Sequence, residues 1–113
     1  MIKFTILLRR RQDMSHEEFV AYHKNKHAPL FSSLPEVKQN VRKYVQCHNI
    51  PFTMPGLPPI IYDGITELWF DDADKIGDVF GAKSYMELIR PDEEMFLDLH
   101  GCSFLITTEN QVI

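Results

Sequence analysis

Hydrophobic and polar side chains alternate from the first residues of the chain, which predicts a β-strand over residues 2–9. Successive side chains on a strand point to opposite faces of the sheet. One face of this strand is apolar and consists of Ile2, Phe4, Ile6 and Leu8. The other face is only half polar and consists of Lys3, Thr5, Leu7 and Arg9.

A helix is predicted to follow, from a cap at Ser15 to about Phe31. The Ser15 side chain can accept a hydrogen bond from the free backbone N–H groups of the first turn, and Glu18 completes a capping box. Glu17 and Glu18 also place negative charge at the positive end of the helix dipole.

The remaining elements are predicted from apolar runs and turn residues. Three further strands are expected, at 41–49, 64–70 and 102–108. Two further helices are expected, at 72 to about 83 and at about 91–99. Pro91 fits the first turn of the last helix, and the acidic residues that follow it suit a helix N-terminus. The prolines between residues 50 and 62 exclude a regular strand or helix there.

The predicted order β-α-β-β-α-β is that of a ferredoxin-like α+β domain with a four-stranded antiparallel sheet. The first and third strands are central in this topology, and the second and fourth are edges. Because 113 residues fit one domain, residues 1–113 are expected to form a single unit. Cys47 and Cys102 then lie on opposite edges, out of reach of a disulfide.

Two helices cover only one face of such a sheet, so the second face keeps exposed apolar residues. Leu7 lies on this face, with either the pair Leu68 and Phe70 or the pair Ile65 and Trp69 from the third strand. An apolar surface of this kind aggregates or finds a partner. Face-to-face association into a closed barrel is the simplest remedy, and a homodimer is therefore expected.

Composition narrows the classes of partner. The net charge of −4 disfavours non-specific binding to nucleic acid or to an anionic membrane. No apolar stretch approaches the roughly 20 residues that span a bilayer, and the first residues suit a strand better than a signal peptide. A cytoplasmic protein with reduced cysteines is expected. The absence of Walker and dinucleotide-binding glycine patterns predicts no cofactor.

The most informative polar residues lie on the first predicted helix. Four residues share one helical face by their spacing: Phe19, His23, His27 and Leu30. The apolar members turn this face toward the sheet, so the histidines either bond to backbone at the edge of the core or line a pocket where neutral imidazole can move protons. The two histidines also have the spacing of a zinc pair, but no third ligand is indicated, and no metal site is predicted.

The second strand has a polar face, which consists of Arg42, Tyr44, Gln46 and His48. This face is either exposed to solvent or lines a cavity. In the second case Tyr44, His48 and His27 converge on a ligand, and the tyrosine can hold a developing oxyanion. The apolar loop of residues 50–62 is interpreted as a pocket lid or an arm on a partner subunit. Asp92 and Asp98 are interpreted as surface and capping residues.

These segments together resemble the EthD family. The resemblance lies in residues 19–30 (FVAYHKNKHAPL), 44–48 (YVQCH), 62–71 (YDGITELWFD) and 92–98 (DEEMFLD). It implies a dimeric α+β barrel with a ligand cavity between the sheet and the helices of each subunit. His27 matches the family's helix histidine and Tyr44 a recurrent tyrosine, whereas His23 stands where tryptophan is usual.

The resemblance also implies a function. It indicates a cofactor-independent enzyme that decarboxylates, cyclises or isomerises a small cyclic, aromatic or polyketide-like compound by proton transfer. His27 is expected to be the acid/base and Tyr44 the oxyanion partner, while His23, His48 and Phe19 bind and orient the substrate. The alternatives are a non-catalytic dimer that binds a small molecule or serves a stress response, and a cofactor-free monooxygenase of the same fold.

Overall fold

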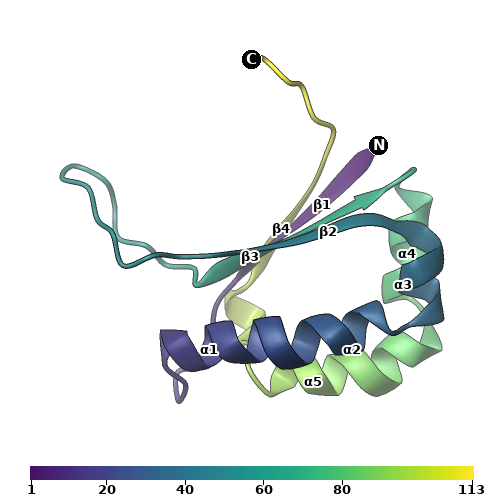
Figure 1. Ribbon diagram of the computed structural model, residues 1–113, viewed down its shortest axis with the longest axis horizontal. Coiled ribbons are helices and arrows are strands. Elements are labelled where there is room, and N and C mark those ends of the chain that lie inside the picture. The colour runs from purple at the N-terminus through teal and green to yellow at the C-terminus, as the bar shows by residue number, and fades with distance from the viewer.

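A computed structural model describes all 113 residues and contains one four-stranded antiparallel sheet with its helices on one side (Figure 1). The strands are β1 (Ile2–Leu8), β2 (Val41–His48), β3 (Gly64–Phe70) and β4 (Ser103–Thr107). Their order in the sheet is β2-β3-β1-β4. The central strands are therefore β1 and β3, which confirms the predicted ferredoxin-like topology.

The first helical segment is continuous and ends close to its predicted limit (Figure 1). It consists of α1 (His16–Tyr22), the π-helical turn η1 (His23–His27) and α2 (Ala28–Ser32). The predicted capping box is confirmed, because Ser15 and Glu18 each accept a hydrogen bond from the backbone N–H of the other. A further helix, α3 (Pro35–Asn40), was not predicted, since Leu34 at its start provides no side-chain cap.

The last predicted helix, at 91–99, is wrong in both of its limits. After α4 (Asp74–Phe80), the chain is helical through the π turn η2 (Tyr85–Ile89) and α5 (Arg90–Glu94). Pro91 therefore lies inside a helical segment and not in its first turn. The residues Leu99–Gly101 form only a single 3-10 turn, η3.

Both of these helical segments contain a π turn, and in each a proline follows two residues after the turn. The first residue after each turn donates its N–H to the carbonyl five residues earlier. Pro29 and Pro91 have no N–H with which to continue the α-helical ladder, so each fits beside a turn that is already irregular. Such π turns occur frequently at functional sites.

Alternation along β3 determines which face of the sheet is covered. Its even-numbered residues are buried toward the helices: Gly64, Thr66, Leu68 and Phe70. Leu7 of β1 pairs with Ile65 and so lies on the opposite face, to which Trp69 also belongs. Of the two arrangements left open by the sequence, the structure has Leu7 with Ile65 and Trp69. No helix covers this open face (Figure 1).

The buried side chains under the helices form two separate clusters. The larger consists of Phe31, Leu34, Val37, Leu68, Phe70, Val79, Tyr85 and Ile89. The smaller consists of Leu8, Phe19, Phe96 and Leu97. Because the apolar core is divided in this way, space remains between the clusters, and the cavity described below has walls from both.

The connection between β2 and β3 is an irregular arm that projects away from the body of the molecule (Figure 1). Its apolar side chains are exposed: Ile50, Phe52, Met54, Leu57, Ile60 and Ile61. No residue of the arm lines the cavity of its own chain. The two cysteines, Cys47 and Cys102, are both free, as expected. None of the helices is both long and apolar enough to cross a lipid bilayer.

Candidate functional site

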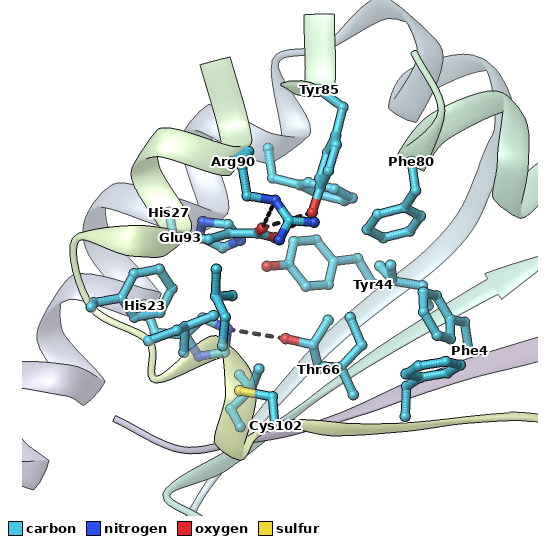
Figure 2. Close-up of a pocket in the computed structure, with 18 of the residues that line it drawn as sticks. Phe4, His23, His27, Tyr44, Thr66, Phe80, Tyr85, Arg90, Glu93 and Cys102 are labelled. Carbon is cyan, nitrogen blue, oxygen red and sulfur yellow. Dashed lines mark hydrogen bonds and ion pairs between the residues drawn. The ribbon is translucent and has the colours of Figure 1, made fainter. Parts of the chain in front are cut away.

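A cavity of about 270 Å³ lies between the helix-covered face of the sheet and the helices (Figure 2). Most of its wall is apolar, with an aromatic share that consists of Phe4, Phe31, Tyr44, Phe80, Tyr85, Phe96 and Phe104. The polar side chains are few and come from both helical segments and from the sheet. A small apolar cavity with a few polar groups is the usual form of a small-molecule site.

His27 lies in the wall of this cavity and is paired with a carboxylate. Its Nδ1 is 2.8 Å from Oδ2 of Asp92, on α5. The hydroxyl of Tyr22 donates to the other oxygen of Asp92, at 2.6 Å. The interpretation of Asp92 as a surface and helix-capping residue is therefore wrong: its side chain is largely buried, in the last turn of its helical segment, and holds two side chains of the first helix. Asp98 does cap, since it accepts the N–H of Gly101.

The protonation of His27 follows from these contacts. A carboxylate can only accept, so Nδ1 carries the hydrogen and Nε2 keeps its lone pair. Burial lowers the pKa of His27, and the interaction with Asp92 opposes this shift only in part. The imidazole is therefore neutral near pH 7. Nε2 has no hydrogen-bond partner in the protein and is not fully enclosed, so it can take a proton from a molecule in the cavity.

His23 is fully buried and uses both ring nitrogens within the protein. Nε2 is 3.1 Å from Oγ1 of Thr66 (Figure 2), and Nδ1 is 2.9 Å from Nε2 of His48. Burial, together with the neighbouring His27 and His48, lowers the pKa of His23 to about 3. The ring of Phe19 stacks on the ring of His23 with centroids 5.5 Å apart. Phe19 and His48 do not line the cavity themselves, and each instead holds His23 in place.

From Tyr44 to His48 the polar face of β2 points toward the first helix, whereas Arg42 is exposed and pairs with Asp71. Of the residues expected to converge on a ligand, Tyr44 and His27 line the cavity and His48 does not. Gln46 donates from Nε2 to the hydroxyl oxygen of Tyr44 and to the backbone carbonyl of His23, both at 2.9 Å. The hydroxyl of Tyr44 therefore keeps its own hydrogen for a molecule in the cavity. Burial raises the pKa of Tyr44 to about 12, so the hydroxyl stays protonated. Tyr44 and His27 both line the cavity without a hydrogen bond between them.

A second polar group in the cavity was not found from the sequence. The hydroxyl of Tyr85 donates to the carboxylate of Glu93, with distances of 2.7 and 2.6 Å to its two oxygens (Figure 2). Arg90 Nε lies 3.4 Å from the same carboxylate. Burial raises the pKa of Glu93 above its usual value. The spacing of Arg90 and Glu93 predicts contact between their side chains only if one helix continues through Pro91.

No group of three or more His, Cys, Asp or Glu side chains is placed to hold a metal ion. The spacing of His23 and His27 has another explanation in this structure. Their rings stack with centroids 5.8 Å apart, and three of their four nitrogens bond to protein groups.

Solved structures with the same fold come from several bacteria. An EthD family protein from Bacillus halodurans has 18% identity and a TM-score of 0.71, with 97% of this chain and 99% of that chain covered. A dimeric protein of unknown function with a ferredoxin-like fold from Bacteroides fragilis has 15% identity, a TM-score of 0.66 and coverage of 96% and 95%. An EthD-like protein from Ralstonia eutropha has 15% identity, a TM-score of 0.66 and coverage of 99% and 92%.

These identities are low, so the structural comparison shows the fold alone. No curated protein matches the chain in sequence. The family model of the EthD domain, by contrast, matches residues 11–100, which include both helical segments and all of the cavity's polar side chains apart from Ser103 and Cys102. The chain therefore belongs to the EthD domain family.

Proposed function

We propose that this protein is a cofactor-independent enzyme that moves a proton on a small cyclic, aromatic or polyketide-like molecule. The observation that carries the proposal is the state of His27: its Nδ1 is held by Asp92, while its Nε2 is unbonded at the wall of an apolar cavity. A neutral imidazole oriented by a carboxylate is a competent general base near pH 7. Decarboxylation, cyclisation and isomerisation all require such proton transfer.

The proposed step begins with removal of a proton from a carbon next to a carbonyl group. The proton moves to Nε2 of His27, and the electron pair of the broken C–H bond shifts to the carbonyl oxygen. Asp92 stabilises the imidazolium that results. Tyr44, whose hydroxyl hydrogen is free, donates to the new enolate oxygen. His27 then returns the proton to another atom of the same molecule, so the enzyme is regenerated without a co-reactant.

The roles of the other expected site residues follow from their contacts. His23 is fixed from both sides and borders the cavity beside His27, so it shapes the site next to the base. Phe19 and His48 support His23 from behind. A second candidate function, non-catalytic binding of a small apolar molecule, is favoured by the aromatic wall of the cavity.

We also propose that the protein is a homodimer formed through the open face of the sheet. Apolar side chains from all four strands meet on this face: Leu7, Val45, Ile65, Trp69 and Leu105. The description of the Bacteroides fragilis relative as dimeric supports the proposal. The loop of residues 50–62 is then an arm on the partner subunit, because its apolar side chains are exposed and none of them lines the cavity of its own chain.

Proton exchange tests the enzymatic proposal without knowledge of the natural reaction. Enolisable aromatic and cyclic ketones would be incubated with the protein in D₂O, and deuterium incorporation followed by NMR. We expect the wild-type protein to exchange the proton next to the carbonyl, and His27→Gln and His27→Ala to lose about a hundredfold or more of this rate. The matched control is His100→Gln, since His100 is exposed and does not line the cavity.

Two outcomes would contradict the acid/base role of His27. If both variants keep the wild-type exchange rate, another group is the base. If both fail to fold, as judged by circular dichroism and sedimentation, His27 is a packing residue. Tight binding of the ketones with no exchange by the wild-type protein would favour the carrier.

A further inference from the structure

The guanidinium group of Arg90 has hydrogen-bond donors that no protein group uses. Arg90 lies at the start of α5, and Figure 2 shows its side chain directed into the cavity, beside the hydroxyl of Tyr85. Nε is buried and has no hydrogen-bond partner. The terminal nitrogens lie near the hydroxyl of Tyr85 but form no hydrogen bond of normal geometry with the protein, and they are not fully enclosed.

Arg90 is nevertheless held in place. The carboxylate of Glu93 lies 3.4 Å from Nε, at a geometry that gives an ion pair without a hydrogen bond. The central carbon of the guanidinium lies 5.8 Å from the ring centroid of Tyr85, close enough for a cation–π contact. Glu93 is itself fixed, because Tyr85 donates to its carboxylate. The arginine is therefore anchored on its Nε side, and its outer edge remains available.

A planar guanidinium with an available outer edge matches two oxygens of one carboxylate or phosphate group, and the small, mostly apolar cavity favours the carboxylate, which carries less charge. The Arg90 side chain remains 39% exposed, so water competes in part, and the apolar residues on the cavity side exclude the rest. We infer that Arg90 binds a carboxylate of the ligand, and that the ligands of this cavity are small aromatic or cyclic carboxylic acids. That such acids are substrates rests on the proposed function, whereas their binding at Arg90 does not.

The volume of the cavity limits the size of the ligand, and both of its proposed contact groups depend on α5. Asp92 orients His27, and Glu93, the next residue of α5, anchors Arg90. Neighbouring residues of one helical turn therefore position both the base and the carboxylate site. A cavity of about 270 Å³ is also at the small end of ligand sites. The carboxylate and the reacting atom thus belong to one compact ring system.

Benzoate and benzamide provide a matched pair of probes, because they share a ring and differ in charge at the carboxyl group. Their dissociation constants would be measured by NMR titration of the wild-type protein and of Arg90→Met and Arg90→Lys. Arg90→Met keeps most of the side-chain length and removes the charge, and Arg90→Lys keeps the charge and removes the planar donor edge. The control is Arg42→Met, since Arg42 is exposed and pairs with Asp71 away from the cavity.

We expect benzoate to bind the wild-type protein more tightly than benzamide does. Arg90→Met should weaken benzoate at least tenfold and change benzamide less than twofold, with Arg90→Lys in between and Arg42→Met without effect. Equal binding of the two probes to the wild-type protein, no binding of benzoate, or an equal loss of both probes in Arg90→Met would overturn the inference.

The same titrations separate this inference from the proposed function. The two assays depend on different groups, because benzoate binding involves no proton transfer and proton exchange requires no carboxylate on the ketone. If the proton-exchange assay fails while Arg90→Met still loses benzoate selectively, the enzymatic proposal is wrong and the carboxylate site stands. If exchange depends on His27 but benzoate ignores Arg90, the enzyme stands and the carboxylate site is wrong.

Discussion

Nδ1 of His27 lies 2.8 Å from Oδ2 of Asp92, although the two residues are 65 positions apart in the chain. One belongs to the first helical segment and the other to the last. The pair therefore joins the two segments across one wall of the cavity, and Tyr22 strengthens the junction by donating to the same carboxylate. The reactive orientation of His27 is thus a product of the folded domain and not of its local sequence.

Asp92→Asn tests whether this pair controls the tautomer of His27. An amide can donate to Nδ1, which would move the hydrogen to Nε2 and remove the free lone pair from the cavity. We expect the proton-exchange rate to fall by about a hundredfold, the scale of losing a general base, while the fold is kept. Nitrogen-15 NMR of the imidazole should report the change of tautomer. Asp78→Asn, at an exposed position of α4, is the control, and equal rates in the two variants would contradict the prediction.

Acid should destabilise the protein through His23. Its pKa is about 3 in the folded state against an ordinary value of 6.5, so the unfolded chain binds the extra proton first. The stabilising effect is fully present above pH 6.5 and is lost as the pH falls toward 3. Between these two pH values, His23 lowers the free energy of unfolding by about 1.4 kcal/mol for each pH unit of acidification. The free energy of unfolding would be measured by urea titration at several pH values between 7 and 4.5. It should fall less steeply with decreasing pH for His23→Gln than for the wild-type protein and the control His100→Gln. An identical dependence on pH in all three would refute the role of His23.

Glu93 should act in the opposite direction. Burial raises its pKa in the folded state, so its contribution to stability is greatest below the ordinary value of 4.5 and is lost as the pH rises through the folded pKa. Glu93→Gln removes this titration. The melting temperature of the variant, minus that of the wild-type protein, should therefore be higher at pH 8 than at pH 4. Glu94→Gln, at the exposed neighbouring position, should show no such trend, and a matching trend there would mean that Glu93 is not responsible.

The proposed dimer interface can be tested with a single charge. Ile65→Lys places an ammonium group on the open face of the sheet, on the central strand β3, where a partner would have to bury it at a cost of several kcal/mol. Sedimentation should show a dimer for the wild-type protein at micromolar concentration and a monomer for the variant. Leu88→Lys alters an exposed position on a helix and should leave the dimer intact. A wild-type protein that sediments as a monomer would end the proposal.

Much of the fold could be predicted because it depends on short-range patterns. The limits of β3 follow from the alternation along residues 64–70, and the helix that carries His23 and His27 follows from a capping box and one apolar stripe. Only part of the candidate site could be predicted from the sequence. Asp92 and Glu93 lie in an acidic run after Pro91, which is also the signature of a helix N-terminus, and the two possibilities differ only in tertiary structure. Nothing local indicates that a helix continues through this proline.

Because of the π turns at His23–His27 and Tyr85–Ile89, the geometry of the site depends on the exact number of residues in each helical segment. An α-helix advances about 100° per residue, so deletion of one residue within either turn would rotate one half of the helix against the other by about that angle. His23 would then lose Thr66 if His27 kept Asp92, or the reverse. Side chains around the cavity can be exchanged one at a time to suit different ligands. A change in the number of residues in either helix would instead separate the catalytic and binding groups in a single step.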